Sequence, residues 1–230
     1  MAKKNSEYEA YHSTEILLGL QKEKEDLCCD NELNFLVIPQ ICELHFKLVL
    51  HHLEISEGCI REGKISEAIH QLKRLSQHIA MATDATKSLE WIEPIDFAKI
   101  RKVLGNGSGQ DSPGFNQILR KGPKLWGVFK QKLDETKINI INLHCNPKEH
   151  YDLFLLMQEF LTFDQEFKNY RYQHLILVKR MIGIKSQSLK GAPAKMLELN
   201  MSKEFFPELW AAINEFTQHI GVAGYGVKSR

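Results

Sequence analysis

The sequence predicts an all-α fold organised as a single helical domain. Apolar residues recur at intervals close to 3.6 along nearly the whole chain, and the alternation typical of strands is almost absent. With 230 residues, 43% of them hydrophobic, the chain is long enough to enclose one substantial core. We therefore expect a helical domain over residues 14–220, between a flexible N-terminus (residues 1–13) and a flexible tail (residues 221–230).

The first half of this domain contains three expected helices. They run over about residues 14–28, 33–61 and 66–91, and Gly63 ends the second. In the second helix we expect the buried face to carry Leu36, Leu44, Leu48 and Leu53. In the third we expect it to carry Ile69, Leu72, Leu75, Ile79, Ala82, Thr86 and Leu89.

Pro39 is the unusual residue of this half, because it lies inside the second helix, in the stretch FLVIPQICELHF. A proline within a helix removes one backbone hydrogen bond and clashes with the carbonyl four residues earlier, at a cost of about 3 kcal/mol. Helix formation alone gives no reason for a proline at this position.

The second half alternates helices with two irregular stretches, GNGSGQDSPGF at residues 105–115 and KSQSLKGAPAK at residues 185–195. The first stretch is either a functional loop or a flexible connector. Asn146 has the residue type and position of an N-cap for the longest helix. Helices are expected over about residues 94–104, 146–182 and 207–220.

Charge, motifs and cysteine content exclude several classes of function. Thirty basic residues against 29 acidic ones leave a formal net charge of +1, so no footprint for nucleic acid or an anionic membrane is visible. No apolar run approaches the roughly 20 residues that cross a bilayer. The G-x-S-x-G and G-x-x-x-x-G-K-[ST] motifs are absent. The five cysteines form no C-x-x-C pair, which fits reduced thiols in a cytoplasmic protein.

His174 is the candidate ligand residue, because it lies in the apolar stripe of the longest helix. On spacing alone, a histidine on such a face is more often a core residue with local hydrogen bonds. One histidine cannot form a zinc site, but one imidazole suffices for haem iron, since the porphyrin supplies four nitrogens. An alternative metal set of His45, His51 and His52 lacks a partner of the H-E-x-x-H type, and solvent-facing histidines are the simpler interpretation.

Three segments resemble the tryptophan 2,3-dioxygenase superfamily of haem-dependent aromatic oxygenases. NYRYQHLILVKRMIGIK followed by SKEFFPELW is similar to the proximal-histidine helix of that family and to the segment after its substrate loop. RLSQHIAMATDATKSLEWIEPIDFAKIRKVL resembles its long central helix, and FLVIPQICELHFKLVL resembles its distal helix. The likeness covers most of residues 34–213 and implies a helical bundle that encloses haem b, held non-covalently because no C-x-x-C-H motif occurs.

The resemblance implies roles for individual residues. His174 matches the proximal iron ligand, and Phe35 matches an aromatic residue that lines the substrate pocket. Ser188 falls where the family has a threonine near the amino-acid head of the substrate. Arg120 lies close to the family's carboxylate-binding arginine, with Lys121 as a rival because SPGFNQILRK is not spaced like the family's segment.

Departures from the family pattern imply a divergent member. Pro39 stands where tryptophan 2,3-dioxygenases have a distal histidine that contacts the substrate, and a proline side chain can neither donate nor accept a proton. The glycine-rich substrate loop of the family is replaced by SQSLKGAP. In the stretch 105–115, Ser108 and Ser112 would cap the pocket or donate hydrogen bonds to a haem propionate.

The function that the resemblance implies is a dioxygenase or monooxygenase of the kind found in secondary metabolism. With haem b as cofactor and no catalytic side chain beyond it, the enzyme would transfer oxygen from O2 to an aromatic (indole or phenol) amino acid or derivative. The alternatives are a non-catalytic haem-binding or sensor protein of the same fold, and a helical scaffold without haem. Family members commonly associate, so the resemblance is compatible with a homo-oligomer, a dimer or tetramer, in which the helix over residues 14–28 would dock on a neighbour. A buried position of this helix within its own chain explains the same apolar pattern.

Overall fold

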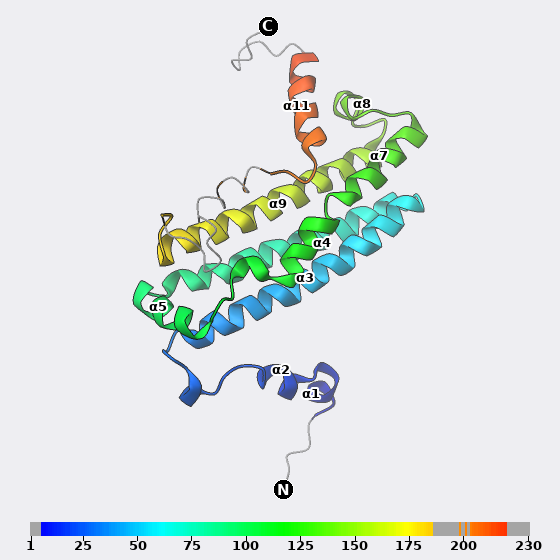
Figure 1. The fold of residues 1–230 in the computed structure, drawn as a ribbon. Helices are drawn as coiled ribbons and strands as arrows, with labels where there is room; N and C mark the ends of the chain where they lie inside the picture. Colours follow the sequence, from blue (N-terminus) through cyan, green and yellow to red (C-terminus); the bar gives the residue numbers. More distant parts are fainter. Residues whose placement is uncertain (1–5, 186–197, 199–200, 202, 220–230) are drawn as a thin grey trace.

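The protein is all-helical in the computed structural model, which describes residues 6–185, 198, 201 and 203–219 (Figure 1). No strand occurs among these residues, which confirms the expected fold class. The α-helices, in chain order, are α1 (Glu7–His12), α2 (Thr14–Leu18), α3 (Glu32–Arg61), α4 (Ile65–Lys87), α5 (Pro94–Val103), α6 (Pro113–Lys121), α7 (Lys124–Thr136), α8 (Ile140–Cys145), α9 (Tyr151–Met181) and α11 (Pro207–His219). Short 3₁₀ turns occur at η1 (Lys24–Asp26), η2 (Ser88–Trp91) and η3 (Gly109–Asp111).

Three long helices, α3, α4 and α9, form the body of the molecule (Figure 1). α4 contacts both α3 and α9, α6 and α7 pack against α3, and α11 packs against α8 and α9. Gly63 makes the turn between α3 and α4 with φ of +76°, a conformation that suits glycine. The N–H groups of Gly63 and Lys64 return to the carbonyls of Ile60 and Cys59, which is the Schellman arrangement at a helix end.

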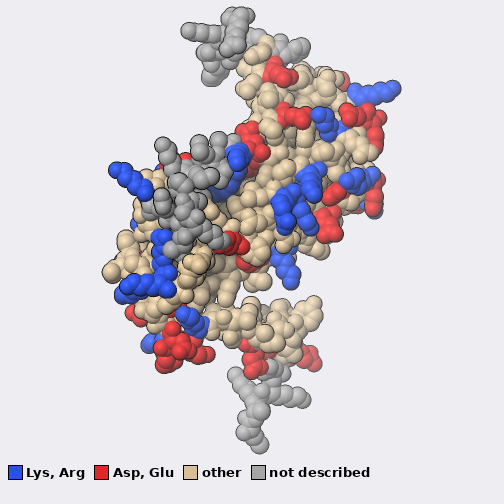
Figure 2. All heavy atoms as spheres, in the orientation of Figure 1, with Lys and Arg blue, Asp and Glu red and all other residues tan. Residues whose placement is uncertain are grey.

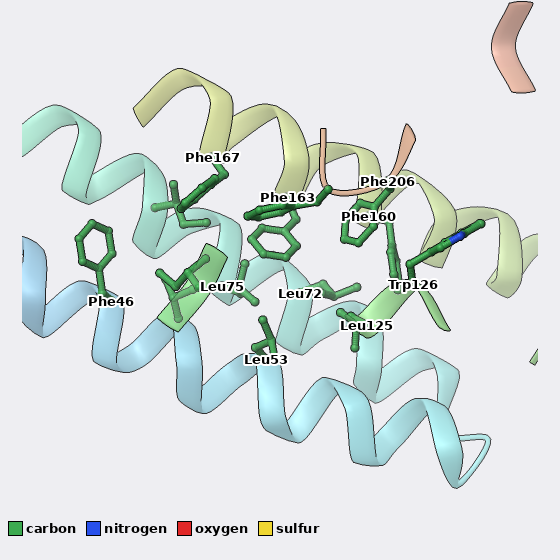
Figure 3. Close-up of a cluster of buried hydrophobic side chains, with 14 of the residues drawn as sticks. Phe46, Leu53, Leu72, Leu75, Leu125, Trp126, Phe160, Phe163, Phe167 and Phe206 are labelled. Carbon is green, nitrogen blue, oxygen red and sulfur yellow. The ribbon is translucent and has the colours of Figure 1, made fainter. Parts of the chain in front are cut away.

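The core is rich in phenylalanine, and its rings come from distant parts of the chain (Figure 3). Phe160 of α9 lies with its ring centroid 4.9 Å from that of Phe129 in α7 and 4.9 Å from that of Phe206, which precedes α11. Leu72 and Leu75 of α4 are fully buried in the same cluster. These contacts fix α9 against its neighbours and so fix the part of α9 that carries His174.

The predicted buried face is confirmed for α4 and partly wrong for α3. Every residue that the sequence predicts in the α4 stripe, from Ile69 to Leu89, is buried. In α3, Leu53 is buried but Leu44 and Leu48 are 48% and 39% exposed. The apolar residues of α3 that are buried are Ile38, Cys42, Phe46, Val49, Leu53 and Ile60. α3 is apolar on more than one side, so the spacing of its leucines did not identify the side that faces α4.

The carboxylate of Asp164 anchors the segment before α11 to α9. Asp164 is fully buried and accepts hydrogen bonds from the backbone N–H groups of Phe205 (3.0 and 3.1 Å) and Phe206 (3.3 Å) and from the indole N–H of Trp210 (2.8 Å). These three donors satisfy the hydrogen-bonding capacity that a buried carboxylate would otherwise lose. This anchor connects the last helix to the helix that carries His174.

The N-terminal arm differs from the prediction. The sequence predicts a loose segment over residues 1–13 and one helix over residues 14–28, whereas the structure has α1, capped by Ser6, then α2 and η1. Ser13, in the left-handed conformation with φ of 52°, separates α1 from α2. The arm lies beside α3 (Figure 1), and the side chain of Gln21 donates to that of Gln40 at 2.6 Å.

The start of α9 also differs from the prediction, because Asn146 does not cap it. Asn146 instead ends α8, with its N–H donating to the carbonyl of Asn142 at 2.8 Å. A turn follows, and α9 begins at Tyr151. At the other end, α9 stops at Met181, as expected from Gly183. The tail at residues 221–230 lies outside the described residues.

α3 is long and apolar enough to cross a membrane when judged by length and composition alone. The sequence was expected to contain no such segment. Core helices of globular proteins share this composition, and α3 buries Phe46, Val49 and Leu53 against neighbouring helices. Figure 2 shows basic and acidic side chains interspersed on one face of the molecule, without a large area of a single sign.

Candidate functional site

A cavity opens between α3, α5, α9 and the segment that precedes α6. Its empty volume is about 1250 Å³ when the open solvent at its mouth is included. Much of its wall is apolar: Phe35, Ile38, Pro39, Phe46, Leu89, Phe97, Leu104, Leu177, Val178, Met181 and Ile182. The lining therefore suits a mostly apolar ligand.

His174 of α9 is half-buried, and it lines this cavity. Burial lowers the pKa of His174 below its ordinary value of 6.5, so the imidazole is neutral at pH 7 and keeps a lone pair on one nitrogen. Neither ring nitrogen has a hydrogen-bond partner in the part of the chain that the structure describes. A neutral, unpartnered imidazole in a cavity is available to bind a metal.

Gly109 comes close to the ring of His174. A Cβ atom at residue 109 would lie 2.9 Å from Nε2 of His174, nearer than such atoms approach in real structures. Only a glycine therefore fits here without movement of the ring or of the chain. This close approach shows that the stretch at residues 105–115 contributes to the site and is more than a connector.

Ser108 and Ser112 also line the cavity, and both shape this stretch of chain. The hydroxyl of Ser108 accepts from the N–H of Gln110 at 3.3 Å, and its own N–H donates to Asp111 at 3.1 Å. Ser112 is the N-cap of α6, because its hydroxyl oxygen accepts from the N–H of Phe115 at 3.1 Å. Both serines thus lie in the lining of the cavity, and both form hydrogen bonds within residues 108–115.

On α3, Phe35 and Pro39 line the opposite wall. The ring of Phe35 meets that of Phe97 in α5 edge to face, with centroids 5.8 Å apart. α3 continues through Pro39 to Arg61, so the proline interrupts one hydrogen bond without ending the helix. The structure therefore brings Phe35, Pro39, Ser108, Ser112 and His174 together around one cavity, from three separate segments.

Arg120 is not part of this cavity, and neither is Lys121. Both side chains are exposed, because α6 turns Gly114 and Ile118 inward and residue 120 lies on another side of the helix. Arg101 of α5 supplies the guanidinium of the lining. The carboxylate-binding role of Arg120 or Lys121 stays a prediction, and Ser188 lies outside the described residues.

Sequence reasoning missed several other polar residues of the lining, among them Cys42, Glu43 and Tyr170. Burial raises the pKa of the Cys42 thiol to about 11 and raises that of the Tyr170 hydroxyl, so both are neutral at pH 7. The Cys42 thiol donates to the carbonyl of Ala82 at 3.7 Å. Helical spacing could have indicated them, because residues one turn apart lie on the same face of a helix. Cys42 and Glu43 follow Pro39 by about one turn, and Tyr170 precedes His174 by one turn.

The alternative metal set of His45, His51 and His52 is not assembled. Nδ1 of His45 lies 3.2 Å from Nδ1 of His78, and Nδ1 of His52 lies 2.8 Å from the side-chain oxygen of Gln71. In the described ranges, no three His, Cys, Asp or Glu side chains are grouped so that they could hold a metal ion. His45 and His52 thus bond across from α3 to α4.

Comparison with known proteins places the chain in a family. A family model described as tryptophan 2,3-dioxygenase matches residues 1–121, more than half of the chain. The chain belongs to the tryptophan 2,3-dioxygenase family. This family consists of haem dioxygenases, and the matched residues include the cavity walls formed by α3, α5 and the stretch at 105–115.

Individual tryptophan 2,3-dioxygenases are distant relatives of this chain. The enzyme of Shewanella woodyi is 23% identical to this chain, and the alignment covers 88% of each protein. That of Bacillus thuringiensis subsp. konkukian is 24% identical over 90% of this chain and 92% of its own length. That of Rhodococcus jostii is 24% identical over 90% of this chain and 91% of its own length. The likeness therefore spans most of the chain at low identity.

Proposed function

We propose that this protein is a haem b-dependent oxygenase that uses O2 to oxidise an aromatic amino acid or a derivative of one, with His174 as the proximal iron ligand. The observation that carries the proposal is the neutral imidazole of His174, which faces a largely apolar cavity and has no partner among the described residues. When bound, haem would supply the iron at which O2 is activated.

The residues around His174 fit such a group. Leu177, Val178 and Met181 give an apolar wall for a flat ring system on the same helix as the ligand. Gly109 has no side chain, so its backbone can lie close to Nε2 of His174 without a clash. Ser108 lines the cavity within reach of polar substituents of a ligand, and we assign it to the haem edge. Ser112 holds the stretch in place instead.

We assign recognition of the substrate ring to Phe35 and Phe97. Their edge-to-face pair gives an aromatic surface on which an indole or phenol ring would pack. We place Pro39 at the distal position, where it adds shape to the wall and no hydrogen bond. Arg101, in place of Arg120, would hold a substrate carboxylate or a haem propionate through its guanidinium. Ser188 remains our candidate for the amino group of the substrate.

Pro39 also favours a second candidate function, a non-catalytic haem-binding or sensor protein of the same fold. A wall residue without a donor or acceptor cannot move a proton during oxygen chemistry. Against this alternative, the cavity contains the carboxylate of Glu43 one helical turn away from Pro39. We therefore favour the enzyme. We place it in the cytoplasm, which agrees with five free thiols.

A hemin titration of wild type, His174→Ala and His144→Ala tests the ligand assignment. His144 matches His174 in being a partly buried histidine with a lowered pKa, but it does not line the cavity. We expect wild type and His144→Ala to give the same Soret band and His174→Ala to lose or shift it. Equal spectra for all three would remove His174 as the ligand.

Oxygen consumption by the reduced, haem-loaded protein then separates enzyme from sensor. The panel is tryptophan, tyrosine, and indole and phenol derivatives with and without a carboxylate. We expect turnover of at least one aromatic compound, and weaker binding of carboxylates in Arg101→Gln. If every compound leaves both the Soret band and the oxygen concentration unchanged, the sensor is the correct function.

We also propose that the arm formed by α1 and α2 packs on a second copy of the chain in a dimer or tetramer. Its large side chains Tyr8, Tyr11, Ile16, Leu18 and Leu20 are 63–86% exposed in the single chain. Burial of this apolar surface would favour association. Sedimentation velocity of the full chain and of a variant without residues 1–20 should show an oligomer and a smaller species, respectively.

A further inference from the structure

Glu43 occupies a junction between α3, the stretch at residues 107–112 and the start of α6. Its carboxylate accepts a hydrogen bond from the hydroxyl of Ser112 with one oxygen and from the N–H of Gly114, at 3.0 Å, with the other. Both oxygens of one carboxylate are thus used to join α3 to a segment about 70 residues later in the chain.

The space around this carboxylate is tightly filled. A Cβ atom at residue 114 would lie 2.7 Å from Oε2 of Glu43 and 2.7 Å from Cβ of Phe46. Gly114 is buried, so the backbone of α6 approaches α3 as closely as a glycine allows. The position of the carboxylate is therefore set on one side by α3 and on the other by the backbone of α6.

The charge of Glu43 is stabilised by donors rather than by a cation. In the described ranges, no Lys or Arg forms an ion pair with this half-buried carboxylate. The N–H of Gly114 belongs to the first turn of α6, where the helix dipole favours a negative charge. The side chains beside it, Cys42 and Tyr170, are neutral. The two bonds to Ser112 and Gly114 are therefore the main support of the charge, and charged hydrogen bonds are the stronger kind.

From Glu43 the hydrogen bonds continue to Gly109. Ser112 caps α6 through the N–H of Phe115, and the side chain of Asn116 donates to the carbonyl of Gln110 at 2.9 Å. Gln110 is the immediate neighbour of Gly109, which lies against Nε2 of His174. A shift at Ser112 is thus transmitted to the residue that lies beside the candidate iron ligand.

We propose that Glu43 is a positioning residue that holds the stretch at residues 107–112 over His174 and so sets the access of ligands to Nε2. Its role in cofactor binding rests on the proposed function, whereas its hold on the stretch does not. Removal of the charge releases the stretch, exposes His174 to water and loosens the edge of the cavity that is nearest to the iron ligand.

Glu43→Gln tests this role, with Glu54→Gln as the matched control. Glu54 lies on the same helix, is exposed and does not line the cavity. The glutamine keeps the size of Glu43 but has one acceptor oxygen, and its NH2 group faces a donor. Ser112→Ala removes one of the two bonds, and Glu43→Asp keeps the charge. Circular dichroism and thermal melting establish that each variant is folded.

Two measurements on the protein without haem read out the positions of the stretch and of His174. Amide hydrogen exchange of residues 107–116 should be about 10- to 100-fold faster in Glu43→Gln, since a charged hydrogen bond is lost, and less affected in Ser112→Ala. The NMR-observed pKa of His174 should rise towards 6.5 in Glu43→Gln as water enters. Glu43→Asp should restore part of both effects, and Glu54→Gln should match wild type.

A third measurement, the hemin titration, connects the stretch to ligand access. We expect Glu43→Gln to change the rate and affinity of hemin binding while Glu54→Gln does not. If exchange and the His174 titration in both Glu43→Gln and Ser112→Ala equal those of wild type, Glu43 does not position the stretch. If exchange and the His174 titration change in these variants but neither wild type nor any variant binds hemin, the positioning role stands and the proposed function fails.

Discussion

Gly109→Ala is the sharpest test of the contact between the stretch before α6 and His174. The added Cβ would lie 2.9 Å from Nε2 of His174 and 3.8 Å from its Cδ2 and Cε1 atoms. Ordinary van der Waals contact begins at 3.4 Å, so the ring or the chain must move by about half an ångström. The movement falls on the nitrogen that we propose as the iron ligand.

The size of the effect follows from the tolerance of metal sites. A displacement of about half an ångström exceeds the roughly 0.2 Å within which metal–ligand distances vary. Changes in the groups that orient a ligand weaken metal binding about 10- to 100-fold. We expect the same loss of hemin affinity in Gly109→Ala. The free energy of unfolding should fall by about 1 kcal/mol, at the low end for overpacking, because Gly109 is exposed and its segment can shift.

Hemin affinity is measured by Soret titration and unfolding by urea, in wild type, Gly109→Ala and Gly127→Ala. A Cβ at residue 127 meets no heavy atom within 4 Å, and the residue lies inside α7. Alanine there should raise stability by about 1 kcal/mol through helix propensity and leave hemin affinity unchanged. Wild-type affinity in Gly109→Ala would show that the close approach to Nε2 does not influence ligand binding.

Two further predictions concern stability. Asp164→Asn should lower the free energy of unfolding by about 2–3 kcal/mol, because an amide has one acceptor oxygen for the donors of Phe205 and Trp210; an unchanged urea midpoint would contradict the anchor. Burial lowers the pKa of His45 and His78, so below about pH 6.5 the unfolded chain binds more protons than the folded chain. The free energy of unfolding that these two rings contribute should therefore be fully present above that pH and be lost as the pH decreases. The free energy of unfolding should change by at most about 1.4 kcal/mol per pH unit for each ring, and by less because both rings are partly exposed. Urea unfolding of wild type and His45→Asn at pH 7.5 and 5.5 checks this. The free energy of unfolding should fall less in the variant.

The fold could be predicted from the sequence because helical periodicity is a local property. The α4 stripe was correct since α4 has one clearly apolar side, between α3 and α9. The buried side of α3 was not identified, because its leucines and its smaller residues mark different sides and only packing decides between them. The cap at Asn146 failed for a related reason: a residue that suits a helix start can equally well end the preceding helix.

The candidate site could be predicted only where a residue type was distinctive. His174 and Pro39 were unusual for their helices, and the glycines and serines of residues 105–115 were unusual for a helical protein. Arg101 lines the cavity and Arg120 does not, because position on a helix, and not order in the sequence, decides which side chain faces the cavity. Glu43 was missed because a glutamate in a long helix has no distinctive sequence signal, and its partners are about 70 residues away.

Pro39 and Glu43 together define what chemistry this cavity can support. Residue 39 offers only shape, and the thiol of Cys42 and the hydroxyl of Tyr170 hold their protons at pH 7. Arg101 is a permanent cation, and His174 is assigned to the iron. Glu43 is thus the remaining carboxylate among the described residues of the lining, and both its oxygens already accept hydrogen bonds. In the proposed oxygenase, a proton that leaves the substrate ring would therefore have to pass through Ser112 to Glu43 or through water. A solvent isotope effect on turnover that persists in Ser112→Ala would rule out the first route.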